Sequence, residues 1–160
     1  MLAFDFQYAS EIMWQLGVLL YHEEDRQLYE GVDDPDTTTA LKFRISTRLP
    51  TGRVASALQR IVGRRYQEND RVVVVWRSFT EGEGSFRGMH SDETGWCAVN
   101  RSTDDRALLD GFIRNIPMHF STAEKDKSAV EQFTNLVCNS GSDDIFEMTD
   151  SLDKMSLNDP

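Results

Sequence analysis

The sequence has few cysteines, no long hydrophobic run and no signal-peptide pattern, which are the features that mark disulfide-rich, membrane-spanning and secreted proteins. It has 160 residues but only two cysteines, Cys97 and Cys138. These are too few for a disulfide framework and lack metal-ligand spacing, so we expect two buried free thiols. The longest apolar run, Val72–Trp76, is far shorter than the ~20 residues of a membrane-spanning helix. The N-terminus lacks the basic region of a signal peptide, so we expect an intracellular, cytoplasmic protein with no transmembrane segment.

Positive charge is also scarce, and it is unevenly distributed. The net charge is −10, which argues against a nucleic-acid-binding protein. Most of the basic residues lie between Lys42 and Arg77. Two interpretations stay open: the arginines lie on the solvent face of a sheet and pair with acidic neighbours, or they form a patch for an anion or a protein partner.

The N-terminal part predicts one short helix over about residues 10–20. Ser10 and Glu11 are typical of a helix start, with Ser10 as the N-cap. The acidic run Asp33–Asp36, which contains a proline, then ends any regular structure.

Alternating polar and apolar residues predict strands between about residues 38 and 120. Leu41, Phe43 and Ile45 alternate with charged residues, which indicates a half-buried strand. The other expected strands span residues 54–66, 71–79, 94–100 and 106–120. Because residues 72–76 are all apolar, we expect the strand 71–79 to be covered on both faces.

The C-terminal part predicts one long amphipathic helix over about residues 125–155. Apolar residues recur there at spacings of three or four, with acidic residues between them. Gly141 lies on the apolar stripe, where it either kinks the helix or allows close approach to the sheet. The fold class is therefore α+β: a single domain, residues 1–160, with about five antiparallel strands packed on a long C-terminal helix.

The glycine-rich stretch "EGEGSFRG", residues 81–88, invites comparison with the phosphate-binding loop of protein kinases. The third glycine of that pattern should be at position 87, but Arg87 is there and Gly88 comes one place late. The catalytic elements of kinases are also missing from the sequence. We interpret the stretch as a flexible connection between two strands, whose glycines permit bulges or strong bending.

No group of residues indicates catalysis or a metal site. His90 with Asp92, Glu93 and Cys97 lacks the ligand spacing of zinc. His119 with Cys97 would be a nucleophile pair only if the fold brought them together. We expect no enzymatic activity, no metal and no cofactor.

Aromatic residues gather on the predicted strands and are either core or the lining of an apolar cavity. The cavity candidates, with Arg77 as a polar anchor, are Trp76, Arg77, Phe79, Trp96, Phe112 and Phe133.

Several short stretches also carry a resemblance to a known family. "RVVVVWRS", "EGEG", "GMHSDETGWC", "PMHF" and "VEQFTNLV" together resemble the START-like, lipid-transfer-type domains of the oomycete mating-specific protein family. The resemblance extends over about residues 9–155. It implies a helix-grip fold, in which a curved antiparallel sheet is closed by a long C-terminal helix over an apolar cavity. It also implies a truncated N-terminal part, since further elements are expected before the short helix.

The function implied by the resemblance is non-enzymatic binding of a hydrophobic ligand, such as a lipid or sterol, between the sheet and the C-terminal helix. The alternative is a protein-interaction or regulatory module with a filled core, which would meet its partner through the basic Lys42–Arg77 region.

Overall fold

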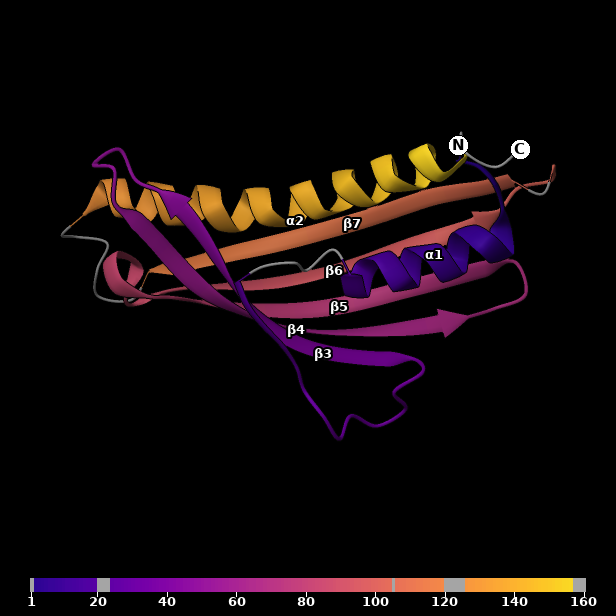
Figure 1. Ribbon diagram of the computed structural model, residues 1–160, viewed down its shortest axis with the longest axis horizontal. Helices are drawn as coiled ribbons and strands as arrows, with labels where there is room; N and C mark the ends of the chain where they lie inside the picture. Colours follow the sequence, from indigo (N-terminus) through magenta and orange to yellow (C-terminus); the bar gives the residue numbers. More distant parts are fainter. Residues whose placement is uncertain (1, 20–23, 105, 120–125, 157–160) are drawn as a thin grey trace.

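The computed structural model describes residues 2–19, 24–104, 106–119 and 126–156 (Figure 1). Its elements are seven strands and two α-helices, with a single 3-10 turn. In chain order they are β1 (Leu2–Asp5), α1 (Phe6–Leu19), β2 (Glu24–Leu28), β3 (Thr38–Arg48), β4 (Val54–Gln67), β5 (Arg71–Gly82), the turn Gly84–Phe86, β6 (Met89–Arg101), β7 (Arg106–His119) and α2 (Lys127–Ser156). The fold is therefore α+β, as predicted.

The strands form one antiparallel sheet in the order β1-β7-β6-β5-β4-β3-β2. The prediction of about five strands was too low, because β1 and β2 were missed. Both are edge strands of four and five residues. β2 has the polar sequence Glu-Asp-Arg-Gln-Leu, so neither strand carries an alternating apolar pattern that a sequence could reveal. β1 pairs with the start of β7.

The starts of the two helices show which residues cap them. The predicted cap, Ser10, lies inside α1, where its hydroxyl donates to the carbonyl oxygen of Phe6 over 2.7 Å. Asp5 takes the capping role instead, since its carboxylate accepts the backbone N–H of Gln7 over 3.1 Å. Asp126 does the same for α2 by accepting from the N–H of Ala129 over 3.0 Å. α2 then continues through Gly141 without interruption.

Both helices pack against one face of the sheet, which we call the inner face. α1 contributes to a cluster of buried side chains with β5, β6 and β7, the α1 cluster: Phe6, Ala9, Met13, Val72, Cys97, Val99 and Ala107. α2 closes a second cluster, the α2 cluster, over β3, β4 and the glycine-rich connection: Leu41, Phe43, Ile45, Ala55, Ala57, Ile61, Phe86, Met89, Ala129, Phe133 and Val137. In Figure 1, α2 runs alongside β7, and α1 lies over β5 and β6. Strands β3 and β4 twist out of line with the other strands.

The opposite, outer face carries no helix in the part of the chain that the structure describes. The expectation that β5 is covered on both faces is therefore wrong. Val72 is buried under α1, whereas Val73 and Val75 lie on the outer face and are partly exposed. The valine run reflects the preference of β-branched residues for strands and not burial on both sides.

The glycine-rich stretch connects β5 to β6, as predicted, but the strands extend further into it than expected. β5 continues to Gly82 and β6 begins at Met89, so only a 3-10 turn and its flanks separate them. Phe86 in this turn is fully buried and meets the ring of Phe133 edge-on at 5.5 Å. A Cβ atom at Gly82 would overlap the backbone of Phe86, so this glycine is required by close approach of the chain to itself.

Candidate functional site

A band of polar side chains crosses the inner face of the sheet between the helices and the strands. The strand register places them in two adjacent rows, Ser78–Glu93–Asn115 and Gln59–Thr80–Ser91. We call these six residues the polar band. Five of them are buried, and Asn115 is half-buried. Buried polar groups are costly unless they are hydrogen-bonded, so the contacts within the band decide what it can do.

Glu93 is the one charged side chain among the buried residues of the described chain, with 6% of its surface exposed. The indole N–H of Trp76 donates to its Oε1 over 2.9 Å, and the amide of Asn115 donates to its Oε2 over 3.2 Å. No ion pair to Glu93 is found among the described residues. Burial raises the pKa of Glu93, and the two hydrogen bonds only partly oppose that shift.

Asn115 connects the polar band to α2. Its amide nitrogen also donates to the carbonyl oxygen of Val137 over 3.1 Å, while its own oxygen accepts from the Ser91 hydroxyl. Nearby, the amide of Gln59 donates to the Ser78 hydroxyl over 2.7 Å. Hydrogen bonds thus join Ser91, Asn115 and Glu93 in one group and Gln59 with Ser78 in another, and Asn115 ties the first group to α2.

A groove of about 480 Å³ lies between β3 and α2. Apolar surface comes from Ile45 and Leu136, and polar groups from Ser46, Thr47, Gln132, Asn135, Asn139 and Ser140. The volume falls within the range of roughly 300–1,000 Å³ typical of small-molecule sites. Phe43, Phe86 and Phe133 fill the α2 cluster and are fully buried, so the groove borders a packed core.

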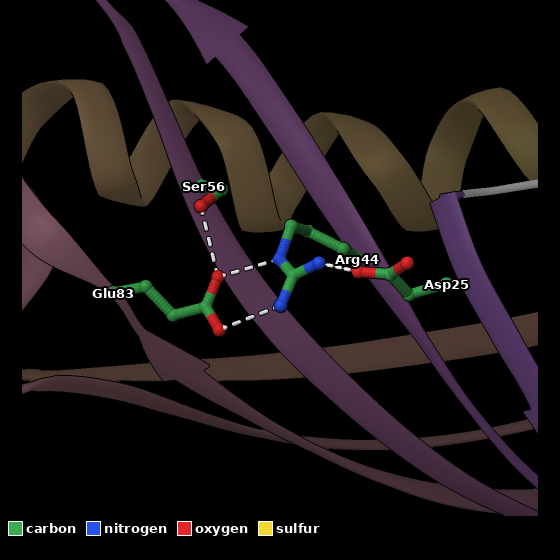
Figure 2. Close-up of polar contacts among 4 residues, drawn as sticks. All are labelled: Asp25, Arg44, Ser56 and Glu83. Carbon is green, nitrogen blue, oxygen red and sulfur yellow. Dashed lines mark hydrogen bonds and ion pairs between the residues drawn. The ribbon is translucent and has the colours of Figure 1, made fainter.

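On the outer face, Arg44 holds together elements that are distant in the sequence (Figure 2). Its guanidinium group donates to both carboxylate oxygens of Glu83, over 2.7 and 3.1 Å, and forms an ion pair with Asp25. Ser56 donates to the same carboxylate over 2.9 Å. These bonds, with the Arg44 bond first, lower the pKa of Glu83. The Arg44 cluster links β2, β3, β4 and the glycine-rich connection, so its role is structural.

The six predicted cavity residues do not lie together. Trp76 is on the inner face, and Phe133 of α2 packs against that face. The other four, Arg77, Phe79, Trp96 and Phe112, point from the outer face into solvent; the side chain of Arg77 is 74% exposed and Phe112 is 55% exposed. These four cannot line a space between the sheet and α2. The prediction failed because aromatic residues were taken as buried by type, without regard to which face their strand position gives them.

The arginines of the basic region are mostly paired. Arg77 donates to Asp92 over 2.8 Å, and the remaining pairs within the region or with its neighbours are Arg44–Glu83, Arg60–Glu81, Arg64–Asp34, Arg65–Glu11 and Arg71–Glu68. The interpretation that these arginines pair with acidic neighbours is therefore confirmed for these residues.

The geometry also bears on the catalytic alternatives. Cys97 pairs with Gly111 on β7, whereas His119 pairs with Met89, so Cys97 and His119 lie eight residues apart along the sheet, about 26 Å. Burial raises the pKa of the Cys97 thiol to about 12, and its sulfur contacts that of Met13 at 3.1 Å.

Cys138 is exposed, contrary to the expectation of two buried thiols. Within the described ranges, no three His, Cys, Asp or Glu side chains are grouped to hold a metal ion.

From the sequence, Glu93 was considered only in a rejected metal group, not as a buried acid, and Asn115 was not singled out. A signal existed for Glu93, because it is an even number of residues from Cys97 and Val99 and so shares their face. No comparable signal existed for Asn115, whose role depends on where α2 lies.

Neither helix of the described chain has the length and apolar character needed to cross a membrane. Comparisons of the chain with known protein families, with characterised proteins and with solved structures find no match.

Proposed function

We propose that the protein is a non-enzymatic, START-like domain of the helix-grip type that binds an amphipathic small molecule, such as a lipid or sterol, between its sheet and α2. The observation that carries the proposal is the groove between β3 and α2, of about 480 Å³. The arrangement of one antiparallel sheet with a 30-residue C-terminal helix on its inner face agrees with the fold that the family resemblance implies.

The lining of the groove indicates the kind of ligand. Ile45 and Leu136 offer apolar surface, while Gln132, Asn135 and Asn139 offer amide donors and acceptors. A molecule with an apolar body and a neutral polar group would satisfy both. The lining contains no charged side chain, so a strongly ionic ligand would find no counter-charge there.

The alternative function, a protein-interaction module acting through the basic Lys42–Arg77 region, receives less support. Six of the eight arginines in that region already have acidic partners, so an acidic protein would have to displace those carboxylates.

Ligand uptake tests the proposal directly. Purified, delipidated protein is titrated with fluorescent fatty acids, phospholipids and a fluorescent sterol, and saturable one-to-one uptake is expected for at least one of them. Asn135→Trp and Asn139→Trp place a bulky ring in the groove from exposed positions and should weaken that uptake. Glu131→Trp is the matched control, since Glu131 is exposed on the same helix but outside the groove.

Two outcomes would contradict the proposal. One is a lack of saturable uptake across the lipid panel. The other is uptake that all three tryptophan variants retain equally, because the ligand would then bind elsewhere.

A further inference from the structure

The outer face of the sheet exposes several large apolar side chains. Those that the structure describes there are Val54, Val62, Tyr66, Phe79, Trp96, Leu108, Phe112 and Ile116. Single exposed apolar residues are common, but contiguous patches of several hundred Å² are rare on monomers and mark interaction surfaces. The side chains mark an interaction surface only if they lie close together.

The strand register shows which of these residues lie close together. Val75, Trp96 and Phe112 stand in one row across β5, β6 and β7. A second row, Phe79–Asp92–Ile116, crosses the same three strands four residues away from the first row. Arg77, Thr94 and Arg114 separate the two rows, and the stems of the arginines can cover apolar surface while their charged ends stay in water. The two rows thus belong to one patch centred on β6.

The face is large enough for a stable association. The five strands β3–β7, at a spacing of ~4.8 Å and with roughly eleven paired residues of ~3.3 Å each, cover roughly 900 Å² when the twist is ignored, and β5–β7, which carry the two rows, make up roughly 500 Å² of it. A stable interface of standard size needs about 800 Å² from each partner. Both helices lie on the inner face, so neither of them obstructs this surface (Figure 1).

The charges on the face indicate which partner fits it. Arg60 pairs with Glu81 and Arg77 with Asp92, both pairs lying within the face. These two pairs are neutral, and Lys42 and Arg114 add positive charge to the same face, so the face lacks the acidic excess of the whole chain, which carries −10. A partner chosen by charge would find little to recognise here. Two copies of this chain, in contrast, could meet through this face with little of the repulsion that their excess acidic charge would cause elsewhere.

We propose that the outer face binds the outer face of a second copy, forming a two-fold symmetric dimer with two stacked sheets. A two-fold axis brings the same patch of both copies together, so a face with apolar rows and paired charges is complementary to itself. Twisted sheets stack in this way about 10 Å apart, with strands inclined by about 30°. Trp96 and Phe112 would then form the centre of the interface, where aromatic residues contribute most to binding.

The mass of the full chain in solution, measured by light scattering and sedimentation over a wide range of concentration, tests the proposal. The expected result is a concentration-dependent species of twice the 18.3 kDa chain mass. Trp96→Glu and Phe112→Glu should each raise the dissociation constant of the dimer at least about tenfold. Both positions are exposed in the single chain, and circular dichroism will verify that the variants fold.

Leu28→Glu provides the matched control. Leu28 is equally exposed but lies on edge strand β2, paired with the inward-facing Leu41, so the change should leave the dimer intact. Mixing Phe112→Glu with Phe112→Lys should restore association that each variant lacks alone. A monomer at every concentration would overturn the proposal, as would a dimer that Leu28→Glu disrupts and the outer-face variants do not. Lipid uptake is a separate measurement, so either proposal can fail alone.

Discussion

Asp92 and Glu93 are consecutive residues of β6 whose carboxylates lie on opposite faces of the sheet and whose pKa values shift in opposite directions. Asp92 accepts two hydrogen bonds from Arg77 on the outer face, which lower its pKa. Glu93 lies under α2, where burial raises its pKa. The alternation of a strand is enough to give two adjacent acids contrasting electrostatic roles.

The two acids should therefore make opposite contributions to the pH dependence of stability. For Glu93, the native state holds its proton more tightly than the unfolded chain does, so stability falls as pH rises from its ordinary pKa of 4.5 through the raised native value. For Asp92, the contribution is present above its ordinary pKa of 3.8 and is lost as pH falls through the lowered native value.

Urea unfolding at a series of pH values checks this with Glu93→Gln and Asp92→Asn. The stability of Glu93→Gln relative to the natural chain should rise with pH, and that of Asp92→Asn should fall. Glutamine offers one acceptor oxygen to the two donors Trp76 and Asn115, so the readout is the slope with pH and not the absolute free energy of unfolding. Parallel pH curves for Glu93→Gln and the natural chain would show that Glu93 titrates normally.

Removing the side chain of Asn115 should loosen α2. Asn115→Ala deletes one donor to Glu93 and the only described side-chain hydrogen bond from β7 to the backbone of α2. We expect a loss of about 1–3 kcal/mol in the free energy of unfolding, the usual cost of leaving buried polar groups unsatisfied. Hydrogen exchange should also show faster opening around Val137. Asn100→Ala, on the outer face of β6, should change stability by less than about 0.5 kcal/mol; equal losses would contradict the role of Asn115.

Gly95 should not tolerate alanine, because the indole of Trp76 lies directly over it. A Cβ atom at this position would overlap the ring. Gly95→Ala must then displace Trp76, weaken its bond to Glu93 and cost about 1–3 kcal/mol by overpacking. Gly63→Ala is the control from the same row, on the other side of Trp76: the nearest atom, Thr39 Cγ2, would be 3.5 Å away. Thermal melts should separate the variants clearly, and similar melting temperatures would rule out this account.

The Arg44 cluster predicts unequal effects for two glutamates near the end of β5. Glu83 receives three hydrogen bonds from Arg44 and Ser56, whereas Glu81 has one contact of 3.5 Å with Arg60. Glu83→Ala should cost about 1 kcal/mol, consistent with partly exposed charged hydrogen bonds. Glu81→Ala should cost less than about 0.5 kcal/mol. Denaturant unfolding of both variants measures the difference, and a larger effect at Glu81 would refute it.

Much of the sheet could be predicted from the sequence because β3 to β7 are long and their pairing repeats over many residues. The edge strands could not, since β1 and β2 take their strand form from main-chain pairing with β7 and β3 and not from their own side chains. The expected strand over residues 106–120 includes Pro117, which lies in β7. It is tolerated there because the pairing of β1 with β7 is confined to the opposite end, at Arg106 and Ala107.

The candidate site was less accessible to sequence reasoning. Trp76 and Phe133 lie in the packed core between the sheet and α2 and do not line the groove. Trp96 and Phe112 were assigned to the same cavity although strand alternation puts them on the other face. The groove combines residues of β3 with residues of α2 about ninety positions later. Periodicity within each element cannot specify how two such distant elements are oriented.

Because α2 follows every strand in the sequence, the ribosome delivers the sheet before the helix that covers it. Strands β3 to β7 all emerge before Phe133 and Val137, which cover Phe43 and Met89 in the finished protein. A nascent chain that has completed its sheet therefore still presents an apolar surface on the inner face, while the outer face is also uncovered. Such an intermediate is prone to aggregation, so the interval before α2 docks is when a chaperone would be most useful to this protein.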